Sequence, residues 1–216
     1  CFVKLGILCG LLILLFASVA MAIEEPRYTV TDKSGAFELR AYAPRVVAET
    51  LVDGSLDDAS SAGFRRIADY IFGNNTSRTG ANNKNGEKIS MTAPVTMTAK
   101  PDKSPSEKIS MTAPVTMQQS AGQWRMYFVM PSQYTLSTLP TPNNLAVTLR
   151  ELPETRMAVL RFSGLAGEDK TATKTAELLA WLKSKNITPT GTPELARYNP
   201  PWTLPFLRRN EVMVAY

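Results

Sequence analysis

Apolar residues recur along this chain with two different periods, and each change of period marks a new structural element. Over residues 27–52 they fall at every second position in three short runs, which predicts three strands. Over Leu56–Ile71 they fall on one helical stripe. Ser55 and Asp58 have the spacing of a capping box, and Gly73 is a suitable stop. The pattern therefore predicts strands followed by a helix.

The rest of the chain repeats this order. A polar loop precedes a duplicated segment described below, and a second predicted helix covers Glu168 to Lys185. We expect the predicted strands Leu145–Leu149 and Met157–Phe162 to form a hairpin around Glu151–Arg156. The predicted strands are Trp124–Met130, Leu145–Leu149, Met157–Phe162, Glu194–Tyr198 and Glu211–Tyr216. Two comparable halves around an antiparallel sheet predict an α+β, barrel-like domain with two helices packed outside.

One string of eleven residues, EKISMTAPVTM, occurs twice without a change, at Glu87–Met97 and Glu107–Met117. Two copies are too few to build a solenoid. We expect residues 87–117 to form an arm of two neighbouring antiparallel strands, joined by a loop over Thr98–Ser106. This arm belongs to the barrel, or it is an accessory hairpin whose edges dock a partner.

Residues 1–22 have the composition of an export signal. Lys4 precedes the apolar run Leu5–Phe16, and Ala20-Met21-Ala22 offers the small-x-small pattern of a cleavage site. The alternative is an N-terminal anchor that is retained. We expect a cleaved leader, a single mature domain over residues 23–216 in the periplasm or the medium, and no membrane partner after cleavage.

The absence of certain residue types excludes several chemistries. The chain has no histidine, and both of its cysteines, Cys1 and Cys9, lie in the leader. A Ser-His or Cys-His nucleophile pair cannot form, and a zinc site is disfavoured because zinc draws mainly on these two residue types. The net charge of +5 comes from scattered Lys and Arg and does not indicate nucleic acid. We expect a protein that is not an enzyme and has no metal site of its own.

Two other groups of residues have both a functional and a structural interpretation. Six methionines concentrate between residues 91 and 130, where thioethers either bind soft metals or fill the core, and we favour the core. Arg208 and Arg209 could clamp a carboxylate or phosphate. We favour a strand entry in which Arg209 and Glu211 share one face. The methionines are Met91, Met97, Met111, Met117, Met126 and Met130.

The assembled motifs resemble the SOUL haem-binding family. The resemblance spans nearly all of residues 23–216, with the motifs in family order. MTAPV in each repeat and RRNEV near the C-terminus are the most specific. The matching segments are Tyr28–Tyr42, Phe64–Phe72, Ile89–Val95 with its twin, Trp124–Pro131, Arg161–Gly164, Tyr198–Pro201 and Pro205–Val212.

This resemblance implies a distorted antiparallel β-barrel of two pseudo-symmetric halves with two packed helices. It also implies non-enzymatic, non-covalent binding of haem or another porphyrin against the first helix and the loop before the last strand. The implied contact positions in this chain are Ser61, Phe64, Ala68 and Leu204. Some members use an axial His, which this chain lacks, so Met or Tyr would ligate the iron, or apolar contact alone would hold the ring. A pocket for another amphipathic small molecule is the alternative.

Overall fold

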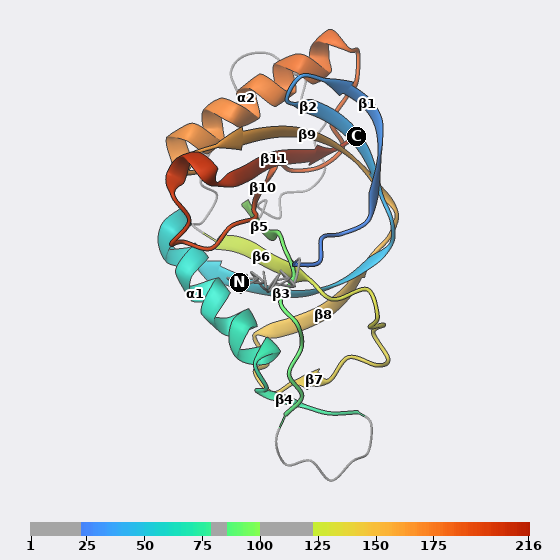
Figure 1. The fold of residues 1–216 in the computed structure, drawn as a ribbon, viewed down its shortest axis with the longest axis vertical. Coiled ribbons are helices and arrows are strands. Elements are labelled where there is room, and N and C mark those ends of the chain that lie inside the picture. Colours follow the sequence, from blue (N-terminus) through green and yellow to red (C-terminus); the bar gives the residue numbers. More distant parts are fainter. Residues whose placement is uncertain (1–22, 79–85, 100–122) are drawn as a thin grey trace, which may run out of the picture.

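The computed structural model describes residues 23–78, 86–99 and 123–216 (Figure 1). Within these residues, no helix is both long enough and apolar enough to cross a membrane. The elements in chain order are β1 (Tyr28–Ser34), β2 (Phe37–Tyr42), β3 (Arg45–Asp53), α1 (Leu56–Ile71), β4 (Asn75–Thr76), β5 (Val95–Ala99), β6 (Gln123–Val129), β7 (Thr141–Pro142), β8 (Val147–Leu152), β9 (Thr155–Ser163), α2 (Glu168–Ser184), β10 (Glu194–Arg197), the 3-10 turn η1 (Pro205–Leu207) and β11 (Arg209–Ala215).

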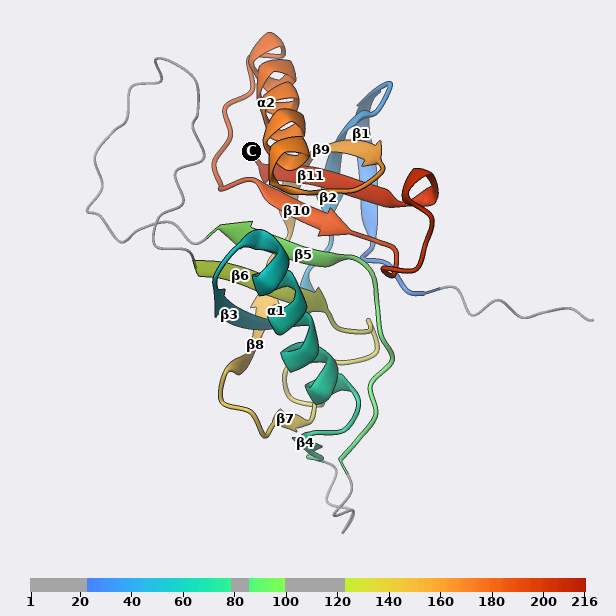
Figure 2. The same ribbon diagram turned by 90° about the vertical axis from the view of Figure 1, so that its left-hand side faces the viewer.

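Nine strands form one curled antiparallel sheet in the order β1-β2-β9-β11-β10-β5-β6-β3-β8. The series β3-α1-β5-β6 matches β9-α2-β10-β11, and the two series meet where β5 pairs with β10. The α+β class, the two pseudo-symmetric halves and the two packed helices are therefore confirmed. Figure 2 shows the halves stacked, with α2 above and α1 below.

The strand that precedes each series in the chain, β2 or β8, pairs with the first strand of the other series. β2 pairs with β9, and β3 pairs with β8, in one uninterrupted register from Phe37↔Leu160 to Thr50↔Val147. The pairing register continues across Ala43-Pro44 and Pro153-Glu154, although these residues are not part of the strands. Proline has no N–H to give to the ladder. Figure 1 shows this bent two-stranded ribbon along the right-hand side.

The expected hairpin around Glu151–Arg156 is therefore wrong. β8 and β9 do not pair with each other, since β8 lies beside β3 and β9 lies between β2 and β11. Sequence reasoning took a proline-containing break between two apolar runs as a turn. Pro153 instead bends a strand that continues in the same direction, as Pro44 does opposite it.

The first helix begins and ends as its sequence predicts. The Ser55 hydroxyl accepts from the backbone N–H of Asp58 at 3.2 Å, and Gly73 follows the helix with a φ of 122°. The helix packs on β3 and β6. At Gly63 the approach is so close that a Cβ would lie 2.8 Å from the Met126 Sδ and 3.2 Å from a Val52 methyl. This contact holds α1 firmly against the sheet.

The main core lies between the two helices and one face of the sheet. Met97, Met126 and Met130 are buried in it, so the core interpretation of these methionines is confirmed. Met91 is half-buried and packs against the same core. Met111 and Met117 lie outside the described residues.

The first copy of the repeat supplies the central strand β5. Its residues pair with β10 along one edge and with β6 along the other, for example Met97 with Leu195 and with Met126. Both edges of Val95–Met97 are therefore occupied, and the expected pairing of the first copy with the second is wrong for this segment. The second copy, Glu107–Met117, lies outside the described residues.

Candidate functional site

The exposed side of α1 carries a stripe of residues at helical spacing. Ser61 and Phe64 are exposed, Ala68 is buried at the foot of the stripe, and Arg65 and Phe72 lie beside them and are exposed. The Phe64 ring packs on the buried ring of Phe128, with centroids 5.6 Å apart, and keeps 39% of its surface exposed. The structure thus places Ser61 and Phe64 on one open, partly aromatic face, whereas Ala68 lies in the same helical row but is buried. We call this row the α1 stripe (Ser61, Phe64, Arg65, Ala68 and Phe72).

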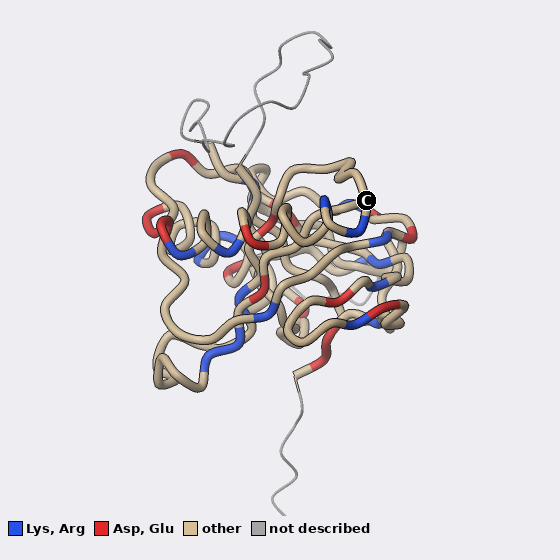
Figure 3. Tube along the Cα trace, turned by 90° about the horizontal axis from the view of Figure 1, so that it is seen from above, with Lys and Arg blue, Asp and Glu red and all other residues tan. Residues whose placement is uncertain are grey.

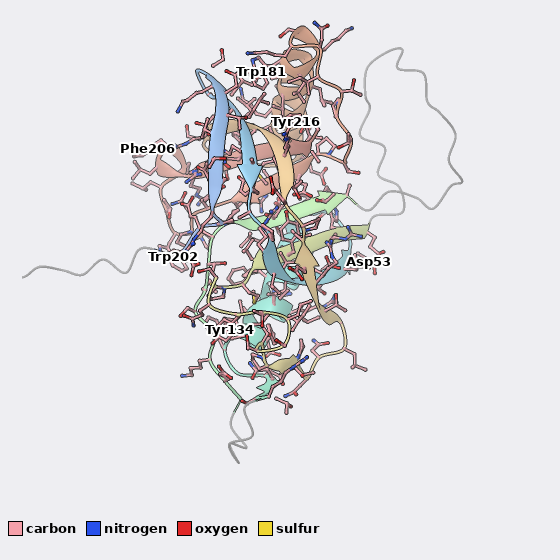
Figure 4. All side chains as sticks on the ribbon, turned by 90° about the vertical axis from the view of Figure 1, so that its right-hand side faces the viewer. Asp53, Tyr134, Trp181, Trp202, Phe206 and Tyr216 are labelled. Atoms are coloured by element: carbon pink, nitrogen blue, oxygen red, sulfur yellow. The ribbon has the colours of Figure 1, made fainter. Side chains whose placement is uncertain are left out.

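The fourth expected residue, Leu204, lies on the loop between β10 and β11. It belongs to a second exposed apolar surface, which sequence reasoning did not recognise. Trp202 is 82% exposed and Phe206 is 70% exposed, and both project from this loop in Figure 4. We call this group the loop surface, and its members are Leu165, Trp202, Leu204, Phe206 and Leu207. The apolar residues of the segment NPPWTLPFL (residues 199–207) could have indicated this surface, but a sequence alone does not distinguish a buried loop from an exposed one.

Arg197, at the end of β10, connects the loop to the start of α1. Its guanidinium donates to the Ser60 hydroxyl at 2.7 Å and to the Ala166 carbonyl at 2.7 Å, and it lies 3.7 Å from an Asp57 carboxylate oxygen. Burial lowers its pKa, although Asp57 opposes the shift. Ser60 is the neighbour of Ser61, so this arginine joins the elements that carry the α1 stripe and the loop surface.

The two arginines before the last strand act within the protein. Arg208 donates to the carbonyls of Thr203 and Pro201, which closes the loop. Arg209 donates to Glu211 on its own strand and to Glu25 near the start of the described chain. The expectation that Arg209 and Glu211 share a face is confirmed, and neither guanidinium is free to clamp a ligand.

A buried charge network anchors both ends of the loop. Glu211 is fully buried and accepts hydrogen bonds from Arg40, Tyr198 and Arg209. Burial alone would raise the pKa of Glu211, but these donors and charges outweigh it and lower the pKa. Burial raises the pKa of Tyr198, whose hydroxyl donates to Glu211 at 2.7 Å. The network is saturated with partners, which is the pattern of a structural ion cluster.

A second carboxylate faces the inside of the curled sheet. Glu194 accepts from the Tyr127 hydroxyl at 2.6 Å. Burial raises the pKa of Glu194 more than the Tyr127 hydrogen bond and the charge of Arg45 lower it. Burial also raises the pKa of Tyr127. Neither residue contacts the α1 stripe, and the sequence offered no spacing motif to find them.

A cavity of about 250 Å³ opens near the turn between β2 and β3. Its wall mixes charged and apolar groups, including Arg45, Met130, Tyr134 and Glu151, and none of the four expected contact residues lines it. Pockets that enclose a drug-sized ligand measure about 300–1,000 Å³. A tetrapyrrole is therefore too large for this cavity, and the α1 stripe suits a flat ring as an open face.

The described residues contain no cluster of His, Cys, Asp or Glu that could hold a metal ion. Acidic and basic residues are interspersed in the view of Figure 3, with no large area of one sign. A flat ring with iron at its centre would meet phenyl rings and a guanidinium on the α1 stripe. These groups fit apolar contact and a carboxylate partner, but they offer no strong ligand for iron.

Comparison with solved structures identifies the fold. The C-terminal domain of EcmrR superposes with a TM-score of 0.55 at 12% identity, covering 87% of this chain and 96% of that domain. An uncharacterized conserved protein from Listeria innocua gives 0.53 at 10% identity, covering 82% and 90%. A hydrolase from the same organism gives 0.51 at 11% identity, covering 85% and 93%. At these identities the likeness extends to the fold alone.

Sequence comparison identifies the family. No curated protein sequence matches the chain. The sequence model of the SOUL heme-binding proteins matches residues 23–215, which includes the α1 stripe, β5 and the loop surface. The chain belongs to the SOUL haem-binding family.

Proposed function

We propose that this protein binds haem or a related tetrapyrrole non-covalently on the α1 stripe, without catalysing a reaction. The observation that carries the proposal is the exposed Phe64 ring, which packs at a tilt of 53° on Phe128 in a chain of this family. A soluble protein rarely leaves aromatic side chains exposed together, and such surfaces commonly bind ligands. Leu204, on the neighbouring loop, would contact the edge of the ring.

The α1 stripe supplies two kinds of contact for a tetrapyrrole. Phe64 and Phe72 offer apolar and stacking surface to the macrocycle. Arg65 lies on the same side of the helix, four residues from Ser61, and its guanidinium can pair with a propionate carboxylate. These contacts would orient the ring, with its propionates toward solvent.

Bound haem would supply an iron whose reactivity depends on its axial ligands. The chain has no histidine, and the α1 stripe itself contains neither Met nor Tyr. Apolar contact therefore carries the binding in this proposal. The expected complex is high-spin and of modest affinity, which suits carriage or buffering of the ring.

The proposal includes export and excludes catalysis. The leader composition of residues 1–22 would direct the chain to the periplasm or the medium. Without histidine no Ser-His or Cys-His pair can form, which supports a carrier and not an enzyme. Because the stripe is exposed, ligand would exchange without a lid.

A second candidate is a smaller amphipathic molecule held in the cavity near the β2–β3 turn. Its volume of about 250 Å³ and its mixed wall, with Arg45 opposite apolar Met130, favour such a ligand over a porphyrin. The residues of this cavity and the α1 stripe do not overlap. Single substitutions can therefore assign a bound ligand to one place or the other.

The test is titration of the full chain with hemin, protoporphyrin IX and a medium-chain fatty acid. The proposal predicts saturable, one-to-one binding of both tetrapyrroles with a shifted Soret band, and weaker binding of the fatty acid. Fatty-acid binding alone, lost on substitution of Arg45, would replace the proposal by the second candidate. An unsaturable hemin signal equal to that of an unrelated basic protein would remove it.

A further inference from the structure

The loop surface includes exposed apolar side chains that the proposed tetrapyrrole site on α1 does not use. Trp202 and Phe206 project outward from the loop (Figure 4), and Leu207 is 62% exposed. Leu165 joins them, because the N–H of Gly164 donates to the Pro205 carbonyl at 2.9 Å. Five large apolar side chains are thus exposed on two loops that a backbone hydrogen bond joins. A surface of this kind marks a contact with another apolar phase.

Part of the backbone of the loop is hydrogen-bonded from within. Arg208 donates to the carbonyls of Thr203 and Pro201, and the Asn199 side chain accepts from the N–H of Arg209 at 2.6 Å. The N–H groups of Thr203 and Leu207 donate to the carbonyls of Pro200 and Leu204. Pro200, Pro201 and Pro205 have no N–H at all. These bonds lower the cost of bringing the loop to the edge of an apolar phase. The N–H groups of Trp202, Leu204 and Phe206 have no such partner among the described residues and would keep their hydrogen bonds to water in the hydrated interfacial region.

The start of the described chain lies beside the same surface. Glu25 accepts two hydrogen bonds from Arg209, both at 3.0 Å, directly after the loop. Figures 2 and 4 both show the beginning of the chain (blue) next to the red loop. The sequence just before Ile23 contains the apolar run Leu5–Phe16. If this run is retained as an anchor, which is the alternative to a cleaved leader, it would place the loop surface toward the membrane that holds it.

We propose that the loop surface is a membrane-contact surface that inserts Trp202, Phe206 and Leu207 into the interfacial region of a lipid bilayer. Trp favours this region because its ring is apolar and its N–H is polar. Arg209, at the start of β11, is paired with Glu25 and Glu211. Arg208 is bonded to loop carbonyls and keeps its positive charge, so we expect a mainly apolar contact with at most a modest gain from anionic lipid. The sequence alone led us to expect no membrane partner; the exposed loop is the reason to propose one.

The test uses tryptophan fluorescence of the full chain mixed with phosphatidylcholine vesicles whose acyl chains carry bromine. Residues 1–22 contain no tryptophan, so insertion of the leader itself gives no signal. Trp124 is buried and Trp181 is half-buried against the core, which makes Trp202 the reporter. We expect quenching and a blue shift, and we expect Trp202→Phe to remove most of both. Trp181→Phe serves as the matched control and retains them.

A second variant keeps the reporter and changes its surroundings. Phe206→Ser with Leu207→Ser is expected to abolish most of the quenching, whereas Leu145→Ser, at a 94% exposed position elsewhere, leaves it unchanged. Circular dichroism verifies that each variant is folded. Equal quenching in all variants, or none in the wild type, overturns the proposal and favours a protein partner for the loop. The assay contains no hemin, so its result is independent of the proposed tetrapyrrole site.

Discussion

Arg40 and Glu211 form a two-pronged ion pair across an intervening strand. The Nη1 and Nη2 atoms of Arg40 on β2 lie 2.8 and 3.0 Å from the Glu211 carboxylate oxygens on β11, with β9 between the strands. Arg40 is 2% exposed and Glu211 is fully buried. Tyr198 and Arg209, which flank the loop between β10 and β11, donate to the same carboxylate. The ion pair therefore also anchors both ends of that loop.

Removing one partner of this pair will destabilise the fold strongly. Arg40→Met leaves Glu211 with a charge in a buried site, and we expect a loss of about 3–5 kcal/mol in the free energy of unfolding. The control is Arg150→Met, which breaks a half-exposed pair with Glu49 and is expected to cost less than about 1 kcal/mol. Urea unfolding measures both. Equal small losses would show that the buried pair is not needed.

The same carboxylate predicts acid sensitivity. Donors lower the pKa of Glu211 below its ordinary value of 4.5. Its ionisation therefore stabilises the fold fully above the unfolded-state pKa, and this contribution is lost as the pH falls through the lowered, folded-state pKa. We expect Glu211→Gln to reduce the free energy of unfolding at neutral pH and to flatten its decline in acid. An unchanged slope between neutral pH and the acid transition would contradict this assignment.

The pKa of Glu194 is shifted in the opposite direction from that of Glu211. Burial raises its pKa, so its contribution to stability is present below the unfolded-state pKa and is lost as the pH rises through the folded-state pKa. Glu194→Gln retains an acceptor for the Tyr127 hydroxyl while removing the charge. We therefore expect the variant to gain stability relative to the wild type as the pH rises from acid to neutral. Chemical unfolding at several pH values measures the difference, and a falling difference would refute the sign.

One copy of the repeat is expected to suffice for the fold. Deleting residues 100–117 retains the first copy and all of β5, whose residues Val95–Thr98 are paired on both edges, and joins Ala99 to Gln118. The shorter connection to β6 lowers the entropy cost of closing the loop, so we expect stability within about 1–2 kcal/mol of the full chain. Thermal unfolding and circular dichroism measure this. Loss of the folded signal would instead assign the second copy to the core.

Local features of the sequence predicted local structure well. Ser55, Asp58 and Gly73 predicted both ends of α1 because caps act within a few residues. The β8–β9 hairpin was wrong because Pro153 can end a strand or bend it, and only the partner strand decides which. The pair Arg40–Glu211 joins residues 171 positions apart, so no spacing rule could predict it.

For the candidate site, too, the sequence predicted the features that depend on local spacing and missed those that depend on tertiary contacts. Helical spacing placed Ser61, Phe64 and Ala68 on one side of α1, and the family resemblance selected them as contacts. That selection stays a prediction. The exposure of Trp202 could not be foreseen, because it depends on Arg208 and on three prolines that hold the loop away from the sheet.

The most direct test of the proposed site compares hemin binding by three chains: the wild type, Phe64→Asp and Leu145→Asp. Both substitutions place a charge at an exposed apolar position, but only Phe64 lies on the α1 stripe. We predict saturable one-to-one binding by the wild type and by Leu145→Asp, and an affinity about tenfold weaker or lower still for Phe64→Asp, equivalent to about 1.4 kcal/mol. Equal Soret titrations for all three chains would contradict a tetrapyrrole site on α1.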